Sequence, residues 1–308
     1  AAGAGGAVTL RTARISGLAS TGPLSALALD CPSLRVNGDQ IHCDRGRLTG
    51  ALGSLGGQDT RFNARTGTDG RLHVRHDEFA IAGGPARVSL VLAGTRGVLD
   101  AALAETDIAQ AAVLARPWLE LPEGFTVAGK GQGTVRASGR GDLLRSADAD
   151  LAIARLDFAD ATGMLAGEAI SGLVRAHLES ARDGFAVTDG RLELAGGQAY
   201  VEPVFLDFGV HRADIDFSGH LDTEAARFDA DRFVLVHEGV LQASGNAILD
   251  IAGENLLPQA RVRIEALHVA AALPTYLQPF LIDTSLKDLE GAGTIRGELD
   301  VTGALPSR

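Results

Sequence analysis

The stretch that decides the fold reads Asp183-Gly184-Phe185-Ala186-Val187-Thr188-Asp189-Gly190-Arg191-Leu192-Glu193-Leu194-Ala195-Gly196-Gly197. Apolar and polar residues alternate along it, as they do in a strand with one dry face. Pairs typical of tight turns, Asp-Gly and Gly-Gly, interrupt this alternation every few residues. The stretch therefore predicts short antiparallel strands joined by tight turns.

The same alternation recurs along most of the chain, at residues 71–75, 88–92, 151–153, 206–210, 215–217 and 262–264. Turn pairs punctuate it at Asn37-Gly38, Asp69-Gly70, Gly83-Gly84, Asp183-Gly184, Asp189-Gly190, Gly196-Gly197 and Glu238-Gly239. This spacing predicts a meander of about 20 strands. Only two segments predict helix: 108–116, with Asp107 as N-cap, and 268–281, interrupted by Pro274 and Pro279.

A longer repeat lies over this pattern, between residues 105–139 and residues 265–303. In each copy a helix-forming segment leads into a glycine-rich one, Gly131-Gln132-Gly133-Thr134-Val135-Arg136 or Gly291-Ala292-Gly293-Thr294-Ile295-Arg296. A second echo relates residues 68–72 to residues 188–192. Because repeats of this kind stack along an axis, we expect residues 1–308 to form one continuous repeating segment. The sequence opens without a targeting segment and stops abruptly after residues 299–303, so we expect it to be a fragment of a longer protein.

Composition excludes several classes of protein. The formal charge of −11, without a compensating basic stripe, disfavours a nucleic-acid partner. The longest apolar runs, such as residues 109–115, are far shorter than the roughly 20 residues that cross a bilayer as a helix. The 39 glycines are spread through the turn pairs, which favours many short strands over a flexible linker.

An amphipathic sheet must cover its apolar face, and two short helices are too small to cover so many strands. Three arrangements satisfy this requirement. The sheet folds on itself as a sandwich or solenoid, closes as a barrel, or leaves a curved groove that an apolar ligand fills.

Two motifs resemble the AsmA-like family of Gram-negative envelope proteins, in particular its YdbH, YhdP and TamB branches. The first is the helix that ends in proline before an apolar-Gly-x-Gly strand, and the second is residues 183–192 with the following Gly-Gly pair. The resemblance covers roughly residues 25–303. It implies a mainly β fold, in which a long curved antiparallel sheet forms an elongated repeating β-groove with an apolar interior and two short helices.

The resemblance also implies a function, which is bridge-like lipid transport across the periplasm without chemistry or cofactor. Phospholipid would be the ligand, and an N-terminal helix absent from this sequence would anchor the protein in the inner membrane. Contacts with either membrane or with envelope partners would use parts outside this chain. The apolar phase of the strands would then line the lipid groove at Leu72, Val74, Val88, Leu90, Leu151, Ile153, Phe185, Val187, Leu192, Leu194, Leu206, Phe208, Ile215, Phe217, Phe233, Leu235, Val262 and Ile264.

The alternative is a structural or adhesin-like module of the cell envelope, a β-solenoid or β-sandwich whose apolar faces pack on one another. The repeated short helix favours the groove, as does the lack of a regular rung of roughly 20 residues. An enzyme is the least favoured class, because no nucleophile elbow, phosphate loop or paired-carboxylate motif is present.

Cys31 and Cys43 flank the Asn37-Gly38 turn. A two-residue loop there pairs residue 36 with residue 39, which leaves the cysteines one residue from facing each other, and a bulge would align them. We expect a disulfide, with two reduced thiols in a small core as the alternative. No metal site is expected: His73 and His76 fall on opposite faces as solvated or edge residues, and His42 beside Cys43 does not complete a ligand set. Trp118 and Tyr276, at the helix ends, are predicted packing anchors, with a gating role at the mouth of the groove as the alternative.

Overall fold

The computed structural model describes residues 4–15, 24–38, 40–52, 57–116, 121, 123–141, 143–201, 204–250, 256–277, 281, 284–285 and 288–302. The protein is mainly β, with an open antiparallel sheet of 17 strands and two short helices. The predicted fold class is confirmed at this level. None of the described helices is long and apolar enough to cross a membrane.

The chain divides into two compact units. Unit 1 comprises residues 1–117 and 131–149, and unit 2 comprises residues 118–130 and 150–308. Unit 1 contains β1 (Ala4–Ile15), β2 (Leu24–Asn37), β3 (Gln40–Leu52), β4 (Gly57–Thr66), β5 (Leu72–Ile81), β6 (Gly84–Ala93), β7 (Arg96–Asp107) and α1 (Ile108–Ala115). The strands β8 (Thr126–Arg140) and β9 (Leu143–Ala159) contribute residues to both units.

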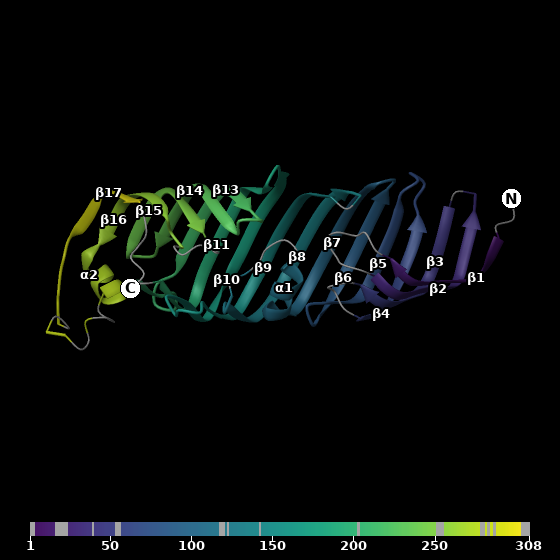
Figure 1. Cartoon of the computed structure of the whole chain (residues 1–308), viewed down its shortest axis with the longest axis horizontal. Helices are drawn as coiled ribbons and strands as arrows, with labels where there is room; N and C mark the ends of the chain where they lie inside the picture. Colours follow the sequence, from purple (N-terminus) through teal and green to yellow (C-terminus); the bar gives the residue numbers. More distant parts are fainter. Residues whose placement is uncertain are drawn as a thin grey trace. The chain divides into compact units, whose positions relative to one another are not determined.

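Unit 2 continues with β10 (Leu165–Ala181), β11 (Gly184–Val201), β12 (Val204–Asp207), β13 (Ala213–Asp222), β14 (Arg227–His237), β15 (Leu241–Asp250), β16 (Gln259–His268), α2 (Val269–Ala272), the π-helical turn η2 (Leu273–Leu277) and β17 (Thr294–Thr302). Within each unit the strands lie side by side in chain order (Figure 1). The short strand β12 is the exception, since both β12 and β13 pair with β11.

Most of the predicted turns join neighbouring strands where expected. Asp69-Gly70, Gly83-Gly84, Asp183-Gly184 and Glu238-Gly239 all lie at hairpin ends. The turns predicted at Asp189-Gly190 and Gly196-Gly197 are wrong, because both pairs lie inside the 18-residue strand β11. Register shifts on β11 occur beside both pairs, so each glycine-containing pair accompanies an irregularity within the strand and does not reverse the chain.

The shorter sequence echo does not mark equivalent structures, whereas both copies of the longer one run from a strand (β7 or β16) through a short helix to another strand (β8 or β17). Residues 68–70 form a turn, whereas residues 188–192 belong to β11. The first glycine-rich segment lies inside β8, whereas Gly291 and Gly293 precede β17. Similar local sequence thus serves as a turn in one place and as a strand in another, because tertiary pairing overrides local propensity.

Both predicted helices are present, and the described part of the second, residues 269–277, is α-helical only at its start. Asp107 caps α1, with a carboxylate oxygen accepting from the Gln110 backbone N–H at 3.1 Å. Four residues of α2 are followed by the π-helical η2, which contains Pro274. Since proline has no backbone N–H to donate, an α-helical ladder is interrupted there. Pro117, Trp118 and Pro279 lie outside the described residues.

Candidate functional site: the apolar sheet faces

In unit 2 the strand register brings the predicted apolar positions together on one face of the sheet. Directly opposed residues in an antiparallel pair point to the same face, so a run of such pairs defines a row across the strands. One row runs through Val174, Leu192, Ile215, Leu235, Ala243 and Ile264. The next, two residues along each strand and so on the same face, runs through Gly190, Phe217, Phe233, Gly245, Val262 and Leu299. We call this surface the unit 2 apolar face.

The remaining predicted positions of β11 and β12 belong to the same face. Phe185, Val187 and Leu194 oppose Leu221, Gly219 and Ala213 of β13. Leu206 and Phe208 pack in a cluster that includes Leu194 and Leu235.

Leu151 and Ile153 are placed through their neighbour Asp150. Asp150 forms an ion pair of 3.4 Å with Arg175, and Arg175 opposes Arg191 in the register of the polar face. Because side chains alternate along a strand, Leu151 and Ile153 point to the other, apolar face.

Unit 1 has an apolar face of its own. Val74 opposes Leu90, and Leu72 opposes Leu92. Val88 opposes His76 on one side and Ala101 on the other. The predicted residues of this unit, Leu72, Val74, Val88 and Leu90, thus share one face.

The structure corrects the expectation that His76 is a solvated or edge residue. It does lie on the opposite face from His73, as predicted, but it is half-buried between aromatic rings and does not lie at an edge. Its ring stands between Phe62 and Phe79, with centroid distances of 5.7 and 5.5 Å. Burial lowers its pKa, while a hydrogen bond to the Arg61 backbone acts in the opposite direction. Its Nδ1 atom is buried and has no hydrogen-bond partner.

The predicted groove residues are neither exposed nor, for the most part, buried. Val88, Val187 and Phe208 are buried, and every other residue of the predicted set is half-buried. A side chain enclosed in a packed core would be almost inaccessible. The two faces therefore present apolar surface that the described part of the chain covers only in part.

The opposite face of the sheet in unit 2 carries charged side chains that form ion pairs. In unit 2 Arg191 interacts with Glu193 and Asp216, and Arg261 and Arg263 pair across strands with Asp300 and Glu298 at 2.8 and 2.7 Å. The neighbouring carboxylates raise the pKa of these arginines. Because all these groups are exposed, each pair adds little to stability. What they establish is a consistent polar face opposite the apolar one.

A buried polar cluster lies on the unit 2 apolar face, where η2 meets the sheet. His237 is 2 % exposed and opposes Ala213 and Leu241 in the register. Its Nε2 lies 3.0 Å from the backbone oxygen of His211, and its Nδ1 lies 2.7 Å from the Tyr276 hydroxyl. The His211 ring packs edge-on against it, with centroids 5.8 Å apart.

These two bonds determine the tautomer of neutral His237. A carbonyl oxygen only accepts, so Nε2 must carry the proton and donate it. Nδ1 then has no proton and accepts from the Tyr276 hydroxyl. Burial raises the pKa of Tyr276 to about 12, which keeps this donor protonated at neutral pH. Tyr276 therefore acts as a packing anchor, as predicted, and it also holds η2 through a buried hydrogen bond. Sequence reasoning missed His237, because only the register places it beneath Tyr276.

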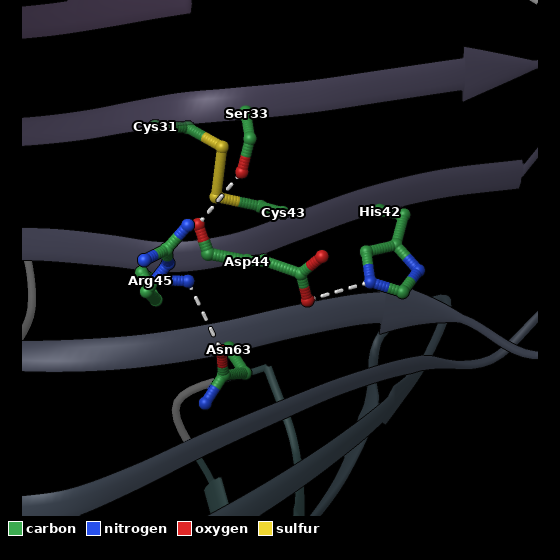
Figure 2. Close-up of a disulfide and its surroundings, with 7 residues drawn as sticks. All are labelled: Cys31, Ser33, His42, Cys43, Asp44, Arg45 and Asn63. Carbon is green, nitrogen blue, oxygen red and sulfur yellow. Dashed lines mark hydrogen bonds and ion pairs between the residues drawn. A yellow bond between two sulfur atoms is a disulfide. The ribbon is translucent and has the colours of Figure 1, made fainter.

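The cysteines lie in the core of unit 1. Figure 2 shows the disulfide between Cys31 and Cys43, whose Cα atoms are 6.0 Å apart. Both residues are almost fully buried and form a cluster with Phe62. The Ser33 hydroxyl donates to the Asp44 backbone oxygen beside them at 3.1 Å.

The hairpin register that was used to predict this bond is wrong by two residues. Asn37 pairs with Gln40, and Cys43 opposes Leu34, so Asn37 belongs to the paired strand and not to the loop. The predicted bulge between β2 and β3 is absent, because their register does not shift between Asp30 and Asn37. A shift lies instead between β3 and β4, from Cys43 to Gly46, where Arg45 has a φ of 55°. The Arg45 backbone N–H donates to the side-chain oxygen of Asn63 at 3.1 Å (Figure 2).

Among the described residues, no group of three His, Cys, Asp or Glu side chains could hold a metal ion. Comparison with known proteins gives no significant match to a family model, a curated protein or a solved structure. The functional argument therefore depends on the two apolar faces.

Proposed function

We propose that this chain binds the acyl chains of phospholipids on its apolar sheet faces, as part of a bridge-like conduit that carries lipid between the membranes of a cell envelope. This is the function implied by the resemblance to AsmA-like proteins, with the periplasm as its location. The protein would supply a path and no chemistry. The N-terminal membrane anchor of that family remains an expectation.

One observation supports the proposal above the others. Rows of aliphatic and aromatic side chains cross successive strands of unit 2 without a charged residue, from Val174 to Ile264 and from Phe217 to Leu299. The side chains of the first row other than Ala243 are half-buried. An apolar surface of this extent that is left partly open to water is unfavourable and is typical of a binding surface.

The glycines in the second row suit a lipid ligand. Gly190 and Gly245 carry no side chain into the face, while Phe217 and Phe233 stand between them. Such a row presents smooth apolar contact without hydrogen-bonding groups. An acyl chain needs no polar partner, so it can occupy this surface without leaving a buried group unsatisfied.

Lipid extraction and native mass spectrometry of the purified chain test the proposal. We expect phospholipid to co-purify and to be displaced by added fatty acid or detergent, because its acyl chains are bound by contact alone. A chain that is folded and free of lipid, and that takes up none from vesicles, would contradict the proposal. That result would favour the alternative of a structural or adhesin-like envelope module.

A further inference from the structure

Four hairpin turns of unit 1 lie at the same end of the strands, along one border of the sheet. They join β2 to β3 at Gly38, β4 to β5 at Gly70, β6 to β7 at Gly94, and β8 to β9 at Gly141. Alternate turns of an antiparallel meander fall at the same edge, and the Gly141 N–H donates to the Thr95 oxygen of the neighbouring turn at 2.7 Å. We call this edge, residues 35–42, 65–73, 91–98 and 139–145, the tip edge.

The turns of the tip edge project into open space. A Cβ atom built on Gly38, Gly70, Gly94 or Gly141 meets no other atom within 4 Å. On the opposite edge, a Cβ on Gly83 would meet the Gln110 side chain of the segment that contains α1 at 2.8 Å. The tip edge is thus free to approach another surface.

Positive charge gathers on the tip edge. Its four segments contain six arginines and three aspartates, a net charge of +3. The arginines are Arg35, Arg65, Arg71, Arg96, Arg140 and Arg145. The two units also differ in their balance of basic and acidic residues. Unit 1 has 15 arginines against 12 acidic residues, whereas unit 2 has 13 basic residues against 27 acidic ones.

Most of these arginines have no carboxylate partner in the described part of the chain. Arg71 pairs with Asp69 at 3.3 Å. Arg140 donates to the Thr95 hydroxyl at 3.3 Å. Arg65 lies between His42 and His73 in the register, in a row that begins at Arg35. Their charge is therefore available to an anionic partner.

Exposed aliphatic side chains accompany the charge. Val36 and Ile41 oppose each other beside the first turn and are 37 % and 44 % exposed. Leu143 and Leu144 follow the last turn and are 60 % and 37 % exposed. Aliphatic side chains in water beside unpaired arginines match a surface that is anionic outside and apolar beneath.

We propose that the tip edge of unit 1 docks on the anionic headgroup surface of a phospholipid membrane, with the arginines on the phosphates and the four aliphatic side chains in the interface. The membrane is favoured over a nucleic acid because phosphate contact alone gives no role to Val36, Ile41, Leu143 and Leu144. The tip edge is distinct from the apolar sheet faces. Its binding to a membrane stands whether or not those faces carry lipid.

Flotation of the whole purified chain with vesicles tests the proposal. We expect binding to vesicles of phosphatidylglycerol and phosphatidylcholine, and little binding to phosphatidylcholine alone. Each arginine at such a surface contributes about fivefold to the partition coefficient. The double variant Arg65→Gln and Arg96→Gln should therefore bind about 25-fold more weakly. Binding should also weaken as salt rises from 0.05 to 0.5 M, because ions screen these contacts over roughly 10 Å.

The matched control is the double variant Arg61→Gln and Arg87→Gln, with the same change of charge in the same unit. Arg61 lies four residues along β4 from Arg65, roughly 13 Å from the tip edge and beyond the screening length of roughly 10 Å at 0.1 M salt. Its vesicle binding should stay near that of the parent. A loss equal to that of the tip variant would overturn the proposal, as would equal binding to neutral vesicles.

A second variant separates the membrane from other anions. Leu143→Ser keeps every charge and should weaken binding to anionic vesicles while leaving any retention on heparin unchanged. If the chain binds RNA or heparin through Arg65 and Arg96 but does not float with anionic vesicles, the partner is another polyanion and the membrane proposal fails. Co-purified lipid reports on the apolar faces separately, so the two proposals can fail independently.

Discussion

His237 connects η2 to the sheet through one buried hydrogen bond, between its Nδ1 and the Tyr276 hydroxyl. Tyr276→Phe removes the hydroxyl and keeps the ring. The Nδ1 atom is then buried without a donor, which costs roughly 1–3 kcal/mol of unfolding free energy. Urea unfolding at pH 7.5 measures the change. No loss of stability would mean that water reaches Nδ1 and that the bond does not hold η2.

The buried imidazole of His237 should also make the unfolding free energy depend on pH. Burial lowers the pKa of His237 below 6.5, and the charge on His211 acts in the same direction, while the bond to the His211 backbone opposes both. The unfolded chain therefore takes up this proton at a higher pH than the folded chain. The stability that neutral His237 contributes is fully present above pH about 6.5 and is lost as the pH falls through the folded pKa.

Comparison with His237→Asn isolates this effect, because His76 titrates in the same direction in unit 1. The parent should lose more unfolding free energy between pH 7.5 and pH 5 than the variant does. Equal losses in the two proteins would show that His237 is not the group responsible.

Gly190 leaves room for the aromatic ring of Phe217 on the neighbouring strand. A Cβ at this position would lie 2.4 Å from Cε2 of Phe217, its cross-strand partner. Gly190→Ala must displace the ring, and we expect a cost of about 1–3 kcal/mol in unfolding free energy. Gly297→Ala is the control, because nothing lies within 4 Å of a Cβ there. Similar losses in the two variants would point to strand propensity instead of the ring.

At the scale of elements, the disulfide joins β2 and β3 across a sequence separation of 12. Closing a loop of this size stabilises the folded state by about 3 kcal/mol, largely by restricting the unfolded chain. The double variant Cys31→Ala and Cys43→Ala should therefore speed hydrogen exchange in β1–β4 and leave β13–β16 unchanged. Thiol counting under denaturing, non-reducing conditions gives the redox state directly. Two free thiols in exported protein would contradict the predicted bond.

The boundaries of β11 could not be predicted from the local sequence. Asp189-Gly190 is a strong turn signal, yet the strand continues through it, because β10 and β13 pair with β11 on both sides. Pairing on two edges supplies more backbone hydrogen bonds than a local turn would. By contrast, Asp69-Gly70 does turn, since β4 and β5 pair with each other across it. Local sequence is the same in the two places, and the neighbours differ.

At the scale of the whole molecule, the question is whether the apolar faces bind lipid or are packed in a closed core. Leu192→Arg places a charge on a half-buried position between Val174 and Ile215. If the face is open to lipid, the variant folds but loses cross-linking to phospholipid from a photoreactive residue at position 264. In a closed core, the same charge would cost several kcal/mol and unfold the protein.

Val234→Arg is the matched control, because Val234 is also half-buried but opposes Asp216 on the polar face. It should fold and cross-link normally. Phe208 is a poor site for this test, because it is only 4 % exposed and Phe208→Asp would destabilise either arrangement. A folded Leu192→Arg variant that still cross-links lipid would show that lipid does not use this face.

The sequence by itself determined the mainly β class, the two helices, the Asp107 cap and the apolar phase of each strand. All of these depend on periodicity or on contacts within a few residues. The tertiary structure decided the register of β2 with β3, the passage of β11 through two turn signals, the packing of His76 between two phenylalanines, and the burial of His237. These depend on which strand lies beside which, and a pairing between distant residues leaves no local trace in the chain. Both sequence and tertiary structure were needed to place one set of apolar side chains on a common face, namely Leu192, Ile215, Leu235 and Ile264. Alternation gives each strand two faces, and only the register shows which faces of neighbouring strands coincide.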